Sequence, residues 1–345
     1  MNALVVPTNR PERMRDFLDA WVPWPWDTIL IIEDAPVVSD SLRHDIRSQP
    51  ASNGNQRVGI FSWHEIDAGL ANGWIFSRGD SAIRCYGFWT AWAMGADYIF
   101  TLDDDCFPVD RDHLRLHLQN LEAVPAWQST VPRLRVRGLP YENVGKLRNV
   151  CLSMGLWMGH PDIDSIQALA RCGRNGDAVV ERSITSRVMP SAQYFPLSGM
   201  NLAFRRDIAC LMYFPPMGVD SPYARFDDIW AGLIVQRICR HLHYAIVCGQ
   251  PLVEHRKASD PFANLVKEAP GIRANEYIWE VIDAIPLRGD SPLACMREMG
   301  AALQNHSRGD AYLARWGSAI LEWCKLFDAE VDVASPKLIA QTGQS

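Results

Sequence analysis

Short apolar runs that end at polar or turn-forming residues recur along the first hundred positions of the chain. Runs of this length without polar alternation are typical of strands buried on both faces of a sheet. Apolar residues recur at helical spacing between them, so the pattern predicts strands joined by crossover helices, as a parallel sheet requires. The expected strands are residues 3–8, 28–32, 57–61 and 98–102, and the expected helices are residues 10–21 and 81–93.

The second half of the chain changes to a mainly helical pattern. Residues 125–200 mix proline, glycine and arginine without a clean period and predict no regular element. The other expected elements are helices at 230–241, 277–285, 292–303 and 312–327, a strand at 244–247 and a loose tail at 335–345. We therefore expect an α/β domain over residues 1–270, a helical region over 271–330 and a tail over 331–345.

Composition and charge narrow the class of protein. Of 345 residues, 48% are apolar and 21% are charged, which is typical of a globular protein with a sizeable core. The net charge of −6 argues against nucleic acid as a main partner, because binding to phosphate backbones needs an excess of basic residues. No apolar run has the length of a membrane span and no basic leader opens the chain, so we expect a cytoplasmic protein. The nine cysteines form no C-x-x-C pair and are expected to be reduced and mostly buried.

Three consecutive carboxylates, Asp103, Asp104 and Asp105, follow the strand at 98–102. Open α/β sheets bind ligands at the carboxyl ends of their strands, and adjacent carboxylates repel one another unless a cation compensates them. Asp103 and Asp105 can point the same way and hold a hard divalent ion against a diphosphate. The alternative is a solvated acidic turn. The sequence contains neither a glycine-rich dinucleotide motif nor a P-loop.

A second acidic pair, Asp227 and Asp228, is expected to open the helix that includes residues 230–241. Carboxylates in a first helical turn are favoured by the exposed N–H groups, so capping alone would explain the pair. The neighbouring Arg225 and several aromatic residues are typical of a pocket and favour a functional role.

Histidines allow two further interpretations. His255 either has a structural role or completes an oxygen-rich metal site, where Arg256 or Lys257 would meet phosphate charge. His113 and His117 have the spacing of two metal ligands on one helix face. Their segment is charged and amphipathic and lacks a third ligand, so we expect them on a solvated face.

Several blocks of sequence resemble one family, in the same order along residues 3–272. The family is the reversibly glycosylated polypeptides, or UDP-arabinopyranose mutases, best known from plants. The blocks are LVVPT (4–8), DSAIRCYGF (80–88), YIFTLDDDCF (98–107), GLW (155–157), PDID (161–164), GMNLAF (199–204), RFDDIWAG (225–232) and HRKASDPFANL (255–265).

The resemblance implies an α/β fold of the GT-A glycosyltransferase type, a Rossmann-like mixed sheet flanked by helices, followed here by the helical C-terminal region. It implies a D-x-D site for Mn²⁺ or Mg²⁺ formed by Asp103, Asp105 and His255, and catalytic roles for Asp227 and Asp228 beside the sugar. It implies contacts of Pro7, Thr8 and Asp34 with uracil and ribose and of Arg84 with the diphosphate. The expected nucleotide-sugar-binding residues are thus Pro7, Thr8, Asp34, Arg84, Asp104, Asn201 and Lys257.

One position departs from the family pattern. The family carries a reversibly glycosylated arginine a few residues after an R-G-Y-P string. Here the string is Arg137-Gly138-Leu139-Pro140, and the expected position falls near Val144. Arg148 is the nearest arginine, so Arg137 and Arg148 complete the expected catalytic residues.

The resemblance leaves three functions open. The first is a metal-dependent UDP-sugar mutase that interconverts pyranose and furanose forms, as for UDP-arabinose. The second is a UDP-sugar-dependent, or self-acting, glycosyltransferase, and the third is a nucleotide-sugar-binding subunit without turnover. The family also makes a homo-oligomer an expectation, in which Trp316 and Trp323 are either contact residues or, as we favour, ordinary core residues.

Overall fold

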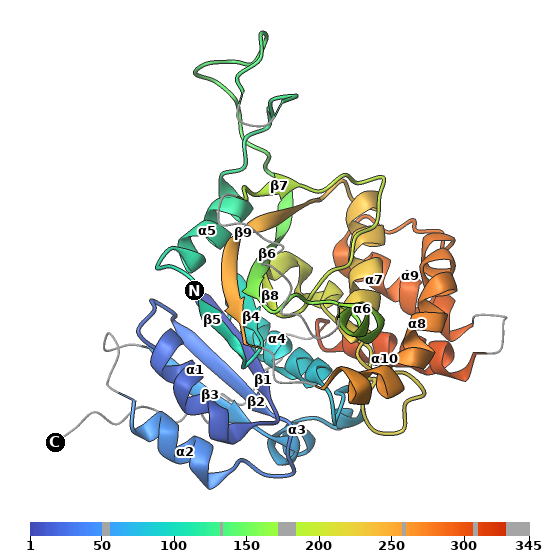
Figure 1. Cartoon of the computed structure of the whole chain (residues 1–345). Helices are drawn as coiled ribbons and strands as arrows, with labels where there is room; N and C mark the ends of the chain where they lie inside the picture. Colours follow the sequence, from blue (N-terminus) through green and yellow to red (C-terminus); the bar gives the residue numbers. More distant parts are fainter. Residues whose placement is uncertain (50–55, 132–133, 172–183, 257–259, 306–309, 329–345) are drawn as a thin grey trace.

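The computed structural model describes residues 1–49, 56–131, 134–171, 184–256, 260–305 and 310–328. Its centre is one mixed sheet with the strand order β3-β2-β1-β4-β8-β6-β9-β5, and β7 also pairs with β9 (Figure 1). The strands are β1 (Asn2–Thr8), β2 (Thr28–Glu33), β3 (Arg57–Phe61), β4 (Tyr98–Leu102), β5 (Cys106–Pro108), β6 (Val150–Gly159), β7 (Arg187–Val188), β8 (Asn201–Arg205) and β9 (Ala245–His255).

Most strands of the sheet end along one edge. β1 to β4 pair in parallel. β8 is antiparallel to both β4 and β6, and β6 is parallel to β9, so β6 and β9 point the same way as β4. We call the edge where these strands end the carboxyl edge. β8 starts there, because Asn201 pairs with Leu102.

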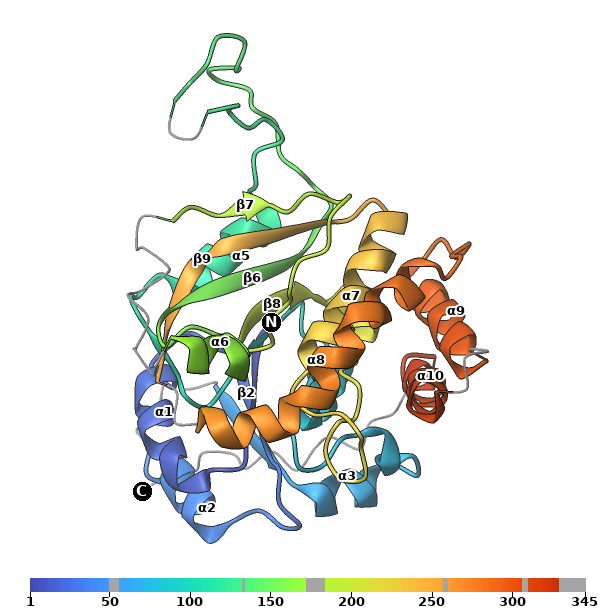
Figure 2. The ribbon, with the colours of Figure 1, turned by 45° about the vertical axis from the view of Figure 1, so that its right-hand side comes forward.

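The alternation of strand side chains places a hydrophobic cluster on each face of the sheet. Leu4 and Val6 face one cluster and Val5 the other, as the strand pleat requires. The helices on the Leu4 face are α1 (Met14–Trp21), α2 (Asp40–Arg47) and α5 (His113–Glu122). Those on the Val5 face include α4 (Arg84–Ala93; Figure 1), and α7 (Asp227–His241), α9 (Pro292–Gln304) and α10 (Ala311–Lys325) (Figure 2). This confirms the predicted α/β class with a Rossmann-like mixed sheet flanked by helices.

The helical C-terminal region shares its core with the sheet. The expected boundary at residue 270 falls inside α8 (Pro261–Asp283), which packs against α7. Trp316 and Trp323 of α10 are fully buried in the same hydrophobic cluster as strand residues, so the interpretation as core residues is confirmed. The tail over 331–345 lies outside the described residues. The remaining helices are α3 (Trp63–Gly69), α6 (Ser165–Ala170), η1 (Pro11–Arg13), η2 (Gly73–Ile75), η3 (Ser81–Ile83) and η4 (Arg206–Leu211).

Differences from the predicted elements concentrate after residue 125. The strand expected at 244–247 continues to His255, and a strand of ten residues, β6, crosses the segment that showed no period. The eight described cysteines are free and buried, as expected. Within the described part of the chain, no helix has both the length and the apolar character to cross a membrane.

Candidate functional site

Arg84 lies at the centre of the acidic residues of the carboxyl edge. It starts α4, is 1% exposed, and donates from its Nη2 to Asp103 Oδ1. Its other donors reach Ser81 O at 3.0 Å, Thr101 Oγ1 at 3.1 Å and Gly199 O at 2.6 Å. Burial alone would raise the pKa of Asp103, but the charge and hydrogen bond of Arg84 lower it. Arg84 therefore holds Asp103 as a carboxylate, and its guanidinium is engaged by protein groups.

The other two carboxylates of the triplet are held by Arg10, which follows β1. Arg10 Nη2 donates to Asp104 Oδ1 and, at 3.1 Å, to Asp105 Oδ2. Asp104 is 4% exposed and also accepts from Thr8 Oγ1 at 2.6 Å. Burial raises the pKa of Asp104 despite these hydrogen bonds. Asp104 and Thr8 thus form an internal link between β4 and β1, and Asp105, whose side chain is 13% exposed, lies beside this link.

The side chains expected to bind a metal are of the chemical types that bind divalent ions. His255 Nδ1 lies 2.9 Å from the carbonyl oxygen of His160, to which it can donate, and His255 Nε2 is 3.7 Å from Asp105 Oδ1. An imidazole held in this way has its Nε2 lone pair available to a metal. Two carboxylates and one imidazole suit Mn²⁺ or Mg²⁺. Among the described residues, no three such groups are placed to hold an ion together. Arg84 pairs with Asp103, and Arg10 pairs with Asp105.

Asp227 and Asp228 open α7 on the other side of Arg84. Asp227 Oδ2 accepts from Ser81 Oγ at 3.0 Å, and Asp228 Oδ2 accepts from the backbone N–H of Gly199 at 2.7 Å. Burial raises the pKa of both carboxyl groups. The negative charges of Asp227 and Asp162 raise the pKa of Asp228 further. Burial therefore favours a proton on the pair, and the functional role of these groups stays a prediction.

Asn201 does not line the site, contrary to the prediction that it binds the nucleotide sugar. It is fully buried, and its Oδ1 accepts from His113 Nε2 and His117 Nε2, both at 3.0 Å. Its Nδ2 donates to the carbonyl oxygens of Leu156 and Pro251, both at 3.2 Å. All of its polar atoms are occupied, so Asn201 has a positioning role for the start of β8.

The prediction of a solvated face for His113 and His117 is wrong. They are 1% and 0% exposed, because the charged segment turns its histidines towards the sheet. Burial lowers the pKa of His113 to about 4 and that of His117 well below its usual value. Ser153 and Asn120 extend this neutral network: His117 Nδ1 is 2.8 Å from Ser153 Oγ, and Asn120 Nδ2 donates to Ser153 Oγ at 2.9 Å.

The residues expected at the nucleoside lie at the ends of β1 and β2. Pro7 and Thr8 are buried, so their side chains support the edge from within. Asp34 accepts from Trp63 Nε1 and from the backbone N–H of Gly79, both at 2.8 Å. Burial raises the pKa of Asp34 despite these hydrogen bonds. Asp34 is half-buried and remains a candidate for the nucleoside side of the site.

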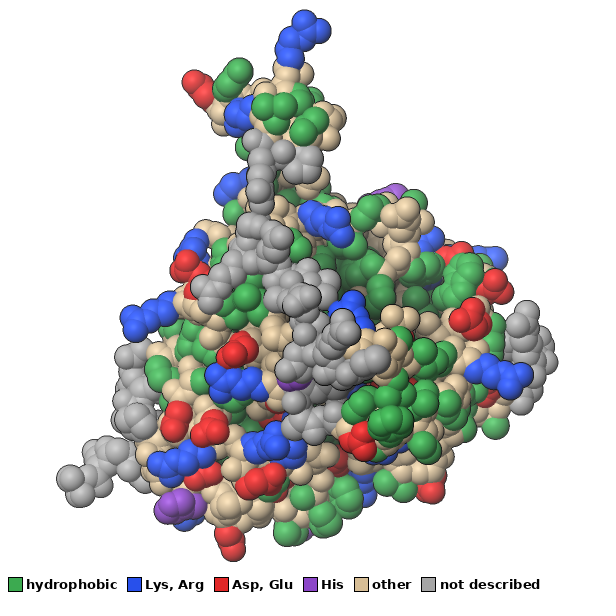
Figure 3. Space-filling model, in the orientation of Figure 1, with side chains coloured by type: hydrophobic (Ala, Val, Ile, Leu, Met, Phe, Trp, Pro, Cys, Tyr) green, Lys and Arg blue, Asp and Glu red, His purple; other side chains and the backbone are tan. Residues whose placement is uncertain are grey.

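The structure does not bring Arg137 and Arg148 to this site. Both are exposed and lie in the segment between α5 and β6, which projects from the opposite edge of the sheet (Figure 1). Arg148 precedes Val150, and β6 separates Val150 from Gly159 by about 30 Å at the usual rise per residue. Exposed apolar and basic side chains gather on the projection (Figure 3). Lys257 lies outside the described residues.

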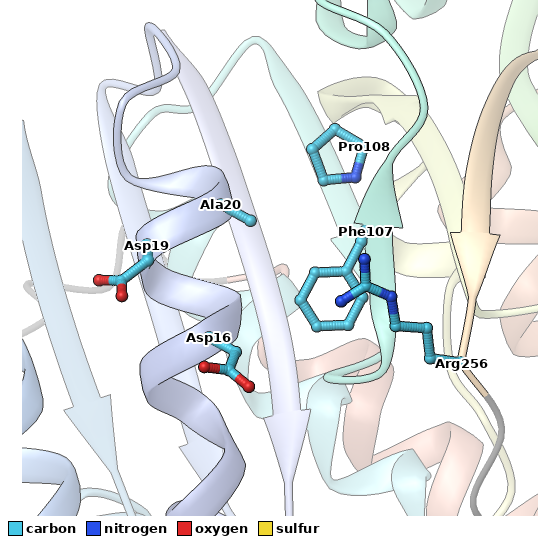
Figure 4. Close-up of a pocket in the computed structure, with 6 residues that line it drawn as sticks. All are labelled: Asp16, Asp19, Ala20, Phe107, Pro108 and Arg256. Carbon is cyan, nitrogen blue, oxygen red and sulfur yellow. The ribbon is translucent and has the colours of Figure 1, made fainter.

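A pocket next to the carboxyl edge offers no better site. It has a volume of about 530 Å³ and lies between α1 and β5 (Figure 4). Its only basic group among the lining residues is Arg256, which is stacked 4.0 Å from the ring of Phe107 and bonded to Glu254 at 2.8 Å. The lining residues are Asp16, Asp19, Ala20, Phe107, Pro108 and Arg256. With its cation already paired and two carboxylates on α1, this pocket does not suit a diphosphate.

Two charged residues of the site were missed in the sequence. Arg10 comes two residues after the first strand, and this position at the carboxyl end of a strand could have indicated a site residue. Asp162 belongs to the PDID block, which carried part of the family resemblance without an assigned role. Its Oδ2 accepts from Ser198 Oγ at 2.7 Å.

Comparisons with known proteins agree with the resemblance. The family model described as reversibly glycosylated polypeptide matches residues 3–331. UDP-arabinopyranose mutase 1 of Oryza sativa subsp. japonica is 30% identical over 346 residues, which cover 94% of this chain and 90% of that protein. Probable UDP-arabinopyranose mutase 1 of Pisum sativum is 32% identical over 347 residues, with 94% and 90% covered. The crystal structure of mouse xyloside xylosyltransferase 1 in its apo form matches with a TM-score of 0.30 and 11% identity over 61% of this chain and 68% of that chain, a likeness too low to support an argument.

Proposed function

Because the chain belongs to the reversibly glycosylated polypeptide family, we propose that it is a UDP-sugar mutase that interconverts UDP-arabinopyranose and UDP-arabinofuranose. The observation that carries the proposal is the convergence of Arg84, Asp103, Asp227 and Asp228 at the carboxyl edge. These residues come from three of the blocks that match the family. Arg84 keeps Asp103 ionised as one of the groups that would hold a divalent ion for the diphosphate, and Asp227 and Asp228 form a proton-bearing pair for a sugar.

The reaction requires a proton to move between two sugar oxygens. UDP detaches when the bond from C1 to the β-phosphate oxygen breaks, which leaves positive charge on the sugar. O4 then loses its proton and bonds to C1, after which the C1–O5 ring bond breaks and O5 takes a proton. The β-phosphate oxygen finally bonds to C1 again. The result is an isomerisation with no net oxidation.

Asp227 and Asp228 can supply both sides of this transfer. Asp228, whose pKa burial and neighbouring carboxylates raise most, carries a proton and donates it to O5. Asp227 lies near the charge of Arg84 and accepts the proton of O4 as a carboxylate. Its negative charge also stabilises the positive sugar while UDP is detached.

Asp103, Asp105 and His255 are the residues that would hold a divalent ion, whose charge would then compete with the arginine partners of the two aspartates. When bound there, Mn²⁺ or Mg²⁺ would neutralise the diphosphate and stabilise UDP as a leaving group. Arg84 keeps Asp103 ionised for this role. Arg10, which is 29% exposed, supplies positive charge next to Asp105.

The direct test is product analysis with the purified full-length protein. UDP-arabinopyranose and Mn²⁺ or Mg²⁺ are incubated with the protein, and the nucleotide sugars are separated by liquid chromatography. A UDP-arabinofuranose peak supports the mutase. Free UDP together with a labelled protein or acceptor identifies a glycosyltransferase instead, and unchanged substrate with measurable binding identifies a non-catalytic subunit.

The role of the metal has its own test. We expect Asp105→Ala to abolish turnover and to leave the fold intact, because Asp105 lies in the turn between β4 and β5 and not in a strand or helix. Removal of divalent ions with EDTA should have the same effect. Product formation that survives both changes would refute the metal part of the proposal and leave the mutase assignment in place.

A further inference from the structure

Asp162 reaches the carboxyl edge from the side of the candidate metal ligands. β6 ends at Gly159, which pairs with His255 at the end of β9. The next residue, His160, provides the carbonyl oxygen that orients the His255 imidazole. Asp162 follows two residues later, so the chain carries it directly past His255.

Asp162 is also linked to the backbone next to the acid pair. Its carboxylate accepts from Ser198 Oγ at 2.7 Å, and Ser198 is 4% exposed. The neighbouring Gly199 donates its N–H to Asp228. The charge of Asp162 contributes to the raised pKa of Asp228 and of Cys106, which follows the acidic triplet. The bond to Ser198 therefore places Asp162 beside the backbone that holds Asp228, and its chain position places it beyond His160, which contacts His255.

The loop that carries Asp162 is fixed on both sides. Beyond it, the backbone N–H of Ser165 donates to Glu268 Oε2 at 2.7 Å, and Glu268 is 4% exposed. Arg225 Nε donates to Glu268 Oε1 at 2.6 Å and ties this link to the segment before Asp227. The loop is thus held by β6 on one side and by α8 on the other. Asp162 is therefore held in place before a ligand binds.

Unlike Asp104 and Asp227, Asp162 is exposed. Ser198 occupies its Oδ2, and Oδ1 has no hydrogen-bond donor within the described part of the chain. A fixed carboxylate with an available oxygen is suited to a ligand that donates hydrogen bonds. It repels phosphate, so the ligand group it faces is not the diphosphate.

We propose that Asp162 binds the sugar of the nucleotide sugar by accepting a hydrogen bond from one of its hydroxyl groups. This inference rests on the proposed function, because it requires a sugar between the acidic triplet and the acid pair. Asp162 would then distinguish a nucleotide sugar from the free nucleotide. It would select sugars with a hydroxyl at the position that it faces.

Binding measurements separate the sugar from the nucleotide. Dissociation constants for UDP-arabinopyranose and for UDP are measured by calorimetry for the wild-type protein, Asp162→Asn and Asp162→Ala. A hydrogen bond to a charged acceptor predicts about tenfold weaker binding of UDP-arabinopyranose by Asp162→Ala. The affinity for UDP should not fall in either variant. Asp40→Asn, an exposed carboxylate on α2, is the matched control and should change neither constant.

Each other outcome is decisive. Equal losses for UDP and UDP-arabinopyranose would show a general effect on the site and overturn the proposal, as would unchanged binding of both. Wild-type protein that binds UDP-arabinopyranose no more tightly than UDP would overturn it as well. If Asp162→Ala loses sugar affinity but the wild-type protein forms no furanose product, the mutase proposal fails and the role of Asp162 stands. If the wild-type protein forms the furanose product and Asp162→Ala keeps its affinity for UDP-arabinopyranose, the mutase proposal stands and the role of Asp162 fails.

Discussion

Two buried polar clusters meet at the segment from Gly199 to Asn201, and they are built in opposite ways. Around Asn201, neutral side chains bond one another and the amide has no remaining donor or acceptor, while His113 Nδ1 is buried without a partner among the described residues. Around Arg84, carboxylates outnumber the guanidinium, and burial raises the pKa of Asp227 and Asp228. The first cluster carries no net charge, whereas the second retains charge that a ligand can compensate.

The short segment links the two clusters mechanically. Gly199 accepts from Arg84 and donates to Asp228, and the carbonyl oxygen of Met200 accepts from the N–H of Asp103 at 3.2 Å. Asn201 anchors the end of this segment in the neutral cluster. We conclude that the neutral cluster fixes the backbone from Gly199 to Asn201, and that this backbone positions the charged cluster around Arg84. The two clusters should therefore respond differently to substitution.

The largest effect is expected from Asp227→Asn, measured as product formation. Loss of the base that takes the proton of O4 should lower kcat by about 10²–10⁴-fold. The midpoint of thermal unfolding should not fall, because burial already disfavours the charge that is removed. Asp207→Asn, an exposed carboxylate at the other end of β8, is the control and should retain full activity. Retained activity in Asp227→Asn would exclude Asp227 as the base.

Asn201→Leu should produce the opposite result, a large loss of stability. The change removes the acceptor of two buried imidazole N–H groups and the donor to two buried carbonyl groups. We expect the free energy of unfolding in urea to fall by about 3–5 kcal/mol, since each unpaired buried group costs about 1–3 kcal/mol. Asn143→Leu, at an exposed position, should have little effect. A loss of activity at unchanged stability would contradict the distinction between the clusters.

The neutral cluster should also weaken in acid. His113 has a pKa of about 4 in the folded protein and about 6.5 when unfolded, so the unfolded chain binds more protons between these values. This contribution to stability is fully present above pH 6.5 and is lost as the pH falls towards 4, by about 3 kcal/mol in total.

A substitution isolates this histidine contribution. Raised pKa values of Asp80 and Asp227 act in the opposite direction, because they stabilise the fold at low pH. The quantity to compare is therefore the slope of unfolding free energy against pH in the wild-type protein and in His113→Gln. Glutamine can still donate to Asn201 but does not titrate. Identical slopes would show that His113 does not contribute.

The smallest effect is expected from Arg137→Gln and Arg148→Gln. Both arginines lie away from the charged cluster, so kcat/KM for UDP-arabinopyranose should be unchanged. The matched comparison is Arg84→Gln, which removes the partner of Asp103 and should lower kcat/KM strongly. A comparable loss in Arg148→Gln would mean that the projecting segment reaches an active site.

Local patterns predicted much of the fold and part of the site. β3 and β4 have the predicted bounds, because a buried strand is a continuous apolar run between polar ends. Asp103 and Asp227 could be identified as candidate site residues, because Asp103 follows such a run and Asp227 starts a helix. Asn201 was misassigned and Asp162 received no role, because both depend on partners more than thirty positions away in the chain.

The order of apolar and polar residues alone determined that this chain forms buried parallel strands with crossover helices and that acidic residues follow the strand at 98–102. These properties depend on interactions between near neighbours in the chain. Only the tertiary structure decided which polar residues are enclosed and which face a ligand. The reversal of β8 beside β4 brings Gly199 between Arg84 and Asp228 and buries His113 and His117 against Asn201. Burial and charge at each group depend on such distant contacts, and they determine its protonation and its role.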